Sequence, residues 1–360
     1  MSPDPRPGAG SDEPGEATGA GPDRRRVGAL DVLRGLFLVA AIGFGWWGLR
    51  EYRTEIVEAL SLTSPARVLV AIAVVFAGVA VTGVVWRSVL AGYGHDVPRL
   101  PASAIFFVGQ IGKYIPGSVW SLGAQADMAR RYRVPSRTTV AVGLVFLWVH
   151  VVSALPVALL LGQRGAGSGD QSALVPGQVS DWITDPPWGV TLAGCLVAIL
   201  LLSPAVLGLM GRLLAGPEQP LRLGWSQSVA LMALMALTWA LYGVGLALVV
   251  PPPALESAGG FAAVLGPVTA AFAASYMVGV VVVLAPAGAG VRELTLIALL
   301  APLFGVPSAT AAALLMRVVH TIDDFAIAGI AWLAARPARD QRPVPDVGPG
   351  ASVRRDSGDG

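Results

Sequence analysis

Long apolar runs separated by short polar connections dominate this chain. A helix needs roughly 20 apolar residues to cross a hydrocarbon core about 30 Å thick. Six runs are long enough, so the pattern predicts an all-α fold, a polytopic bundle of membrane helices. The predicted spans cover residues 30–49, 66–86, 138–162, 188–210, 225–250 and 308–334.

One further apolar region, residues 101–130, contains helix breakers in its middle. Residues 115–117, Ile-Pro-Gly, would open the backbone hydrogen-bond ladder of a helix. Inside a bilayer, such a break survives only within protein or beside a water-filled cavity. We therefore predict two half-helices, residues 102–112 and 118–128, that dip into the membrane and are joined by this bend.

A second apolar region, residues 261–305, is interrupted by APAGAGVRE at 285–293. Its first part, 261–284, is long enough to cross the membrane fully, whereas the first half-helix of the other broken region is not. The sequence alone leaves open whether each broken element is re-entrant or crosses fully.

Arginines concentrate in alternate connections and thereby predict the orientation of the spans. The positive-inside rule assigns the basic connections and both termini to the cytoplasm. This assignment works only if each broken element enters and leaves on the same side of the membrane. The resulting order predicts an inverted repeat, with halves at 27–162 and 188–335 and a site near the membrane midplane. The basic connections are 87–99, 130–137, 211–224 and the C-terminal tail.

The composition supports the membrane class, with 54% hydrophobic and 13% charged residues. The single cysteine, Cys195, excludes disulfides and cysteine-based metal sites within the chain. Residues 1–26 and 336–360 are polar and of low complexity, so we expect two disordered tails around an integral membrane domain at 27–335. The first tail lacks the apolar core of a secretory signal, so the first span must itself direct insertion.

Lys113, the only lysine of the chain, lies three residues before the first break. One interpretation makes it a ligand-binding cation at the bend, and the other makes it a side chain that reaches to the interface. The same region holds further polar positions, among them Ser118 and Gln125. Asp127 and Arg130 are three positions apart and could pair with each other.

The second break places Arg292 and Glu293 just after Gly290. A helix that starts near Val291 would point its positive end at an anion such as a phosphate, with Arg292 as a charge-assisted partner. The alternative is an interfacial loop in which the arginine and the glutamate pair with each other.

The last span contains Arg317, His320 and Asp324 on one helical face. Charges inside a membrane are costly and usually line a bundle interior or a cavity. The alternative is a structural ion network that neutralises itself. Asp323 lies off this face and is expected to be an interfacial cap. His150, on an apolar span, is expected to be a hydrogen-bonded packing histidine rather than a proton relay.

Enzyme signatures are missing from the sequence. It contains no P-loop, HExxH, GxSxG or CxxC pattern, and its three histidines are scattered at 95, 150 and 320. We therefore expect no enzyme activity, no cofactor, no metal site and no nucleic-acid partner.

Two motifs resemble a known family. GKYIPGSVWS at 112–121, followed by Arg130, and PAGAGVRE at 286–293, followed by Arg317, are similar to the lysylphosphatidylglycerol synthase transmembrane-region family, also called flippase-like domain proteins. The resemblance covers residues 30–335. In the second motif, Ala287 and Ala289 replace other small residues of the usual pattern.

The resemblance implies an integral membrane domain, found alone or fused to a soluble aminoacyl-transfer domain, and associated with moving polar lipids between leaflets. It implies functional roles for Lys113, Pro116, Gly117, Arg130, Gly290, Arg292, Glu293 and Arg317. Residues 336–360 are too few for the fused domain, so we do not expect this chain alone to synthesise aminoacyl lipid.

We therefore expect a cell-membrane flippase or transporter of a polar anionic lipid, acting through a cationic cavity. Two alternatives stay open: a carrier of sugars linked to an isoprenoid phosphate, and a non-transporting partner of a glycosyltransferase or lipid synthase. A homo-oligomer is also open. The predicted substrate-binding residues are Lys113, Tyr114, Pro116, Gly117, Ser118, Trp120, Gln125, Arg130, Gly290, Arg292, Glu293, Arg317, His320 and Asp324.

Overall fold

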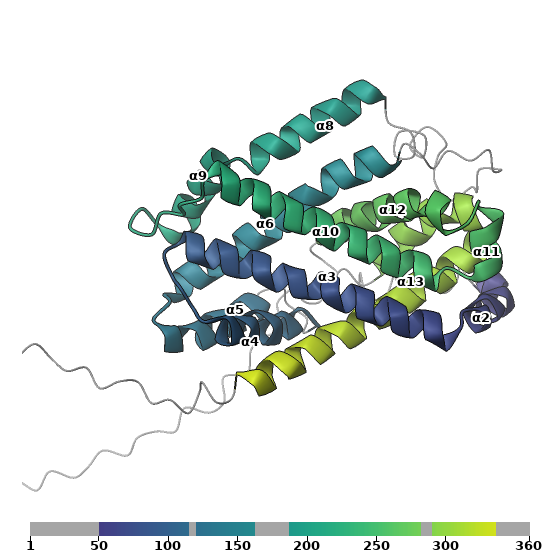
Figure 1. Ribbon diagram of the computed structural model, residues 1–360, viewed down its shortest axis with the longest axis horizontal. Coiled ribbons are helices and arrows are strands. Elements are labelled where there is room, and N and C mark those ends of the chain that lie inside the picture. Colours follow the sequence, from purple (N-terminus) through teal and green to yellow (C-terminus); the bar gives the residue numbers. More distant parts are fainter. Residues whose placement is uncertain (1–49, 115–119, 163–186, 282–289, 336–360) are drawn as a thin grey trace, which may run out of the picture.

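The computed structural model describes residues 50–114, 120–162, 187–281 and 290–335 (Figure 1). Every regular element within these ranges is a helix, in agreement with the predicted all-α class. The predicted first span at 30–49 and both predicted disordered tails lie outside the described residues.

The described α-helices run in chain order from one end of the bundle to the other. They are α2 (Arg53–Leu62), α3 (Pro65–Gly92), α4 (Arg99–Gln110), α5 (Trp120–Ala129), α6 (Ser136–Gly162), α8 (Trp188–Leu201), α9 (Pro204–Ala215), α10 (Trp225–Val249), α11 (Pro252–Ser257), α12 (Phe261–Val281) and α13 (Val291–Ala334). Short 3-10 helices occur at η1 (Arg50–Tyr52), η2 (Ile111–Tyr114) and η3 (Arg130–Tyr132).

Five of the described helices, α3, α6, α10, α12 and α13, are long and apolar enough to cross a membrane. The predicted spans at 66–86, 138–162 and 225–250 correspond to α3, α6 and α10. These helices are compatible with an integral membrane protein.

The predicted single span at 188–210 is instead a bent pair. Helices α8 and α9 meet at an angle of 51° and together have the length and apolarity of a sixth span. The bend has a local cause: the Ser203 side chain accepts a hydrogen bond from the Val206 N–H, and Pro204 occupies the first turn of α9. A serine cap followed by proline starts a new helix rather than continuing the old one.

Helix α13 is a helical hairpin rather than one straight rod. Gly305 has a φ of 74° inside it, a conformation that glycine adopts without strain. The first half, residues 291–304, therefore folds back along the second half, residues 306–334. The Arg317 side chain of the second half reaches the Glu293 carboxylate of the first half, which confirms this antiparallel arrangement. The second half matches the predicted last span at 308–334.

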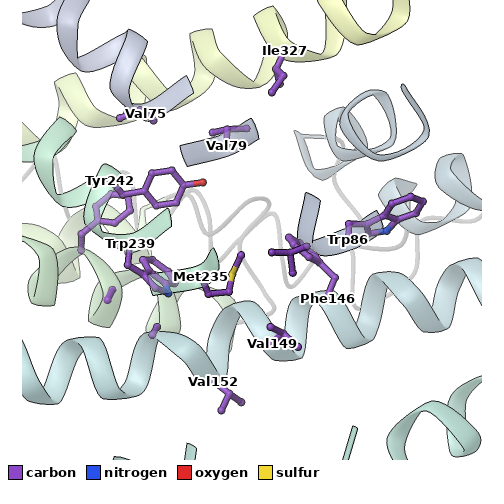
Figure 2. Close-up of a cluster of buried hydrophobic side chains, with 14 of the residues drawn as sticks. Val75, Val79, Trp86, Phe146, Val149, Val152, Met235, Trp239, Tyr242 and Ile327 are labelled. Carbon is purple, nitrogen blue, oxygen red and sulfur yellow. The ribbon is translucent and has the colours of Figure 1, made fainter. Parts of the chain in front are cut away.

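The core lies between α3, α6, α10 and the second half of α13 (Figure 2). Small residues allow close packing of these helices, as is usual inside membranes. Gly243 of α10 faces Thr269 of α12 so closely that a Cβ at that glycine would collide with the threonine side chain. The large aromatic side chains Trp239 and Tyr242 then fill the centre of the bundle with less than 5% exposure each.

The two ends of the bundle differ in charge. In Figure 1, α4, α5 and α9 lie at the left end, whereas α2 and α11 lie at the right end. The exposed η3 segment and the connections around it carry many arginines, whereas α2 and α11 carry glutamates. The left end contains Arg87, Arg99, Arg130, Arg131, Arg133, Arg137, Arg212 and Arg222.

Candidate functional site

The first broken element consists of α4 with η2 on one side and α5 on the other. The predicted half-helices at 102–112 and 118–128 correspond to these elements. They come very close, because a Cβ added to Gly112 would lie 2.6 Å from the Ser121 backbone nitrogen. The predicted bend, with site residues Pro116, Gly117 and Ser118, lies outside the described residues.

Lys113 and Tyr114, at the end of η2, both bind Asp324 of the second half of α13. The Lys113 Nζ lies 2.6 Å from the Asp324 Oδ2. The Tyr114 hydroxyl donates a hydrogen bond of 2.7 Å to the same oxygen. The Tyr114 ring also stacks on Phe325, with 5.5 Å between the ring centroids. The Asp324 side chain is only 12% exposed, so this is a largely desolvated contact between the first broken element and the last predicted span.

Glu293 organises the start of the second returning helix. Helix α13 begins at Val291, as predicted, after Gly290 with a φ of 84°. The Gly290 N–H donates to the Glu293 Oε2 at 2.7 Å, and the Arg317 Nη1 donates to the Glu293 Oε1 at 3.1 Å. The alternative in which Arg292 and Glu293 pair with each other is therefore wrong, because both oxygens of this carboxylate bind other groups.

Arg292 has a different environment. Its guanidinium carbon lies 4.5 Å from the Phe272 ring centroid and 5.2 Å from the Tyr276 ring centroid. The side chain is half-buried, and no carboxylate among the described residues pairs with it. The ring faces stabilise the cation but leave its N–H donors without acceptors. Arg292 thus combines a positive charge with donor capacity for an anion.

Two histidines stack on the rings that Arg292 contacts. His320 lies on Phe272 with 5.3 Å between ring centroids, and His150 lies on Tyr276 with 4.6 Å. Both His150 ring nitrogens and the His320 Nε2 are buried without a hydrogen-bond partner in the described part of the chain. His150 therefore packs as predicted, but it lacks the predicted hydrogen bond.

Sequence reasoning missed the aromatic residues of this site. We call His150, Trp239, Tyr242, Phe272, Tyr276 and His320 the aromatic cluster. A signal was present in the sequence: its aromatic pairs are one helical turn apart in the middle of α10 and of α12. Aromatic residues of membrane proteins usually gather at the interfaces instead.

Asp323 is not the interfacial cap that the helical pattern predicted. Its side chain is completely buried within the second half of α13, well before the helix ends at Ala334. Neither carboxyl oxygen has a hydrogen-bond partner among the described residues. The expectation was wrong because position 323 falls on the stripe that packs against the neighbouring helices.

Three predicted site residues lie apart from the aromatic cluster and the two ion pairs. Trp120 is 41% exposed. Gln125 is buried and packs against Gly109 and Gly143. The exposed Arg130 donates to the Ser136 Oγ at 2.9 Å and does not form the suggested pair with Asp127. The arrangement therefore gathers Lys113, Tyr114, Gly290, Arg292, Glu293, Arg317, His320 and Asp324.

No group of three or more His, Cys, Asp or Glu side chains within residues 50–335, the masked gaps apart, could hold a metal ion. No protein-family model matches this chain, and no curated protein sequence matches it. The chemistry of the site must therefore be argued from its own residues.

Proposed function

We propose that this protein carries a polar anionic lipid between the two leaflets of a cell membrane. The observation that carries the proposal is Arg292, a half-buried guanidinium among apolar helices with no carboxylate partner among the described residues. A buried cation is costly unless an anion compensates it. A lipid phosphate is an anion that a membrane protein meets at this depth.

The chemistry of lipid transfer fits such a site. A lipid head group that crosses the bilayer must exchange water for fixed polar partners, while its acyl chains can stay in the lipid. The guanidinium of Arg292 offers planar, paired N–H donors that suit phosphate oxygens. Lys113 and Arg317 add positive charge to the same site and are held in place by Asp324 and Glu293.

An inverted repeat gives this site its position. The first half comprises α3, the broken element α4–α5 and α6; the second comprises α10, the broken element formed by α12 with the first half of α13, and then the second half of α13. Helix α4 starts from the left end of Figure 1 and α12 from the right end, so the two broken elements enter from opposite sides. Two elements of this kind meet near the midplane in many transporters.

The two histidines support the repeat at the level of single residues. His150 is the fifteenth residue of α6, and His320 is the fifteenth residue of the second half of α13. Each stacks on a ring of α12 and receives an edge contact from a ring of α10: Trp239 for His150 and Tyr242 for His320. Equivalent positions in the two halves therefore carry the same residue in similar surroundings.

The charge difference between the two ends gives the orientation. The arginine-rich end with α4, α5 and α9 faces the cytoplasm, by the positive-inside rule. Helix α3 ends and α13 ends at this side, so both chain termini are cytoplasmic. The resemblance of GKYIPGSVWS and PAGAGVRE to the flippase-like domain family supports the same function. Membership in that family is part of the proposal.

The test is lipid movement in vesicles. Purified protein is reconstituted with trace lipids that carry a fluorophore on an acyl chain, and a membrane-impermeant quencher reports transfer between leaflets. The panel contains phosphatidylglycerol, phosphatidylcholine and an isoprenoid phosphate. We expect faster transfer of phosphatidylglycerol than in protein-free vesicles. Preferential transfer of the isoprenoid phosphate would favour the sugar-carrier alternative, and no acceleration of any lipid would favour the partner protein.

A further inference from the structure

Asp323 is a buried carboxyl that the ion pairs of the site do not use. Its side chain is 0% exposed, and both oxygens lack a hydrogen-bond partner in the part of the chain that the structure describes. An ionised carboxylate in such surroundings is far more costly than a protonated one, because burial penalises the charged form. The empty place on this side chain is therefore that of a proton.

The surroundings of Asp323 link it to the anion site. Asp323 follows His320 by one helical turn, and His320 stacks on the ring that Arg292 covers. Tyr242 of α10 touches His320 edge-on and interacts electrostatically with Asp323, Asp324 and Arg292. The carboxyl and the guanidinium thus share neighbours, although they belong to the two different halves of α13.

Other charged groups around the helix either are paired or lie near helix ends. Asp324 and Tyr242 interact electrostatically with Asp323. The titratable and charged side chains on α13 and on the described elements packed against it are Arg292, Glu293, Arg317, His320 and Asp324 on α13; Lys113 and Tyr114 on η2; Tyr242 on α10; Tyr276 on α12; Arg67 and Arg87 on α3; Arg99 on α4; Arg53, Glu55 and Glu58 on α2; and Glu256 on α11.

Counting charges at the site couples the proton to the anion. Lys113 pairs with Asp324 and Arg317 pairs with Glu293, which leaves the charge of Arg292 unbalanced. With a proton on Asp323, the site has one positive charge in excess and can take one negative charge. Without that proton, the Asp323 carboxylate balances Arg292 and the attraction for an anion is lost.

We infer that Asp323 binds one proton together with the lipid anion at Arg292, so that the protein moves the two as an electrically neutral pair. This inference rests on the proposed function. Water on one side supplies the proton to a carboxylate oxygen of Asp323, and the same O–H bond breaks when the proton returns to water on the other side. The lipid is a phosphodiester with one negative charge, because the excess of the protonated site is one.

The experiment imposes a pH gradient on vesicles that contain the full-length protein and acyl-labelled phosphatidylglycerol. One proton carried with each lipid drives the label toward the alkaline leaflet, with about a tenfold leaflet ratio per unit of pH difference at equilibrium. An imposed membrane potential without a pH gradient should leave the distribution even. A pH dye inside the vesicles should report one proton for each lipid moved, which needs no variant.

Asp323→Asn mimics the protonated carboxyl and cannot release a proton. It should still move the labelled lipid, but it should ignore the pH gradient and respond to a membrane potential instead. Asp127→Asn is the matched control, since Asp127 is exposed on α5, and should respond to pH like the wild type. If the variant does not fold, the proton count in wild type decides alone.

Two outcomes would overturn the inference, and they are distinguishable. Wild type that moves the lipid with an even distribution under a pH gradient, or with no proton uptake, contradicts proton coupling while the proposed function stands. Wild type that moves no lipid faster than protein-free vesicles contradicts both.

Discussion

The ammonium of Lys113 lies 2.6 Å from the carboxylate of Asp324, and this ion pair joins the first broken element to the second half of α13. The Tyr114 hydroxyl binds the same oxygen across 210 sequence positions. A single carboxylate therefore holds both polar side chains at the end of η2. Movement of η2 relative to α13 must break these two contacts together.

Removal of either partner of this pair should destabilise the protein. Lys113→Ala leaves the largely buried Asp324 without its cation. Because Lys113 is 35% exposed, we expect a loss of about 1–2 kcal/mol rather than the larger loss seen for fully buried pairs. Tryptophan fluorescence during unfolding in detergent measures it.

A double-mutant cycle separates the pair from its surroundings. Lys113→Ala and Asp324→Asn should be coupled by about 0.5–1.5 kcal/mol, the range of polar contacts between membrane helices. Tyr114→Phe is the control that removes only the hydroxyl contact and should cost about 1 kcal/mol. Fully additive effects of the two charge variants would show that the ion pair contributes no stability.

The close approach of η2 and α5 predicts a steep dependence on side-chain size at Gly112. Gly112→Ala should destabilise the protein by about 1–3 kcal/mol, because the new Cβ would lie 2.6 Å from the Ser121 backbone nitrogen. Gly123→Ala is the matched control on α5, since no atom lies within 4 Å of a Cβ there. Equal melting temperatures for the two variants would argue against this close contact.

The fork at Glu293 predicts a graded response to substitution. Glu293→Gln keeps an oxygen that can accept from the Gly290 N–H but removes the charge that faces Arg317. Glu293→Ala removes both contacts and leaves the charge of Arg317 uncompensated, so it should lower the melting temperature more than Glu293→Gln does. The reverse order would mean that the carboxylate contributes little to holding the hairpin.

The sequence predicted much of the helical framework because long apolar runs and helix breakers act locally. It located α3, α6 and α10, both half-helices of the first break and the start of α13 at Val291. It missed the bend between α8 and α9, although the signal for it, Ser203 followed by Pro204, is also local. Apolarity alone does not distinguish a straight span from a bent pair.

The partners of the charged residues could not be predicted in this way. Lys113 with Asp324, and Glu293 with Arg317, meet only after the helices pack, and no spacing rule links positions so far apart. The helical pattern placed Arg317, His320 and Asp324 on one face, but it also placed Asp323 at an interface. The buried environment of Asp323 depends on which helices pack there, and this is a property of the tertiary fold.

The proposed orientation predicts which side of the membrane labels each end. Cys195→Ala removes the only native cysteine, and single cysteines are then placed at exposed positions of opposite ends, Asp127→Cys on α5 and Glu256→Cys on α11. In intact cells, an impermeant thiol reagent should modify the cysteine at 256 and spare the one at 127. Labelling at 127 but not at 256 would reverse the orientation.

The central claim is that the guanidinium of Arg292 holds a lipid anion during transfer, and one comparison of variants tests it most directly. The transfer rate of acyl-labelled phosphatidylglycerol is measured for wild type, Arg292→Ala and Arg131→Ala, the last of which removes an exposed arginine of η3. We expect Arg292→Ala to slow transfer by about tenfold or more, because charged hydrogen bonds of this kind contribute about 1.5–3 kcal/mol, and Arg131→Ala to match wild type. A folded Arg292→Ala variant that transfers the lipid at the wild-type rate would contradict the account.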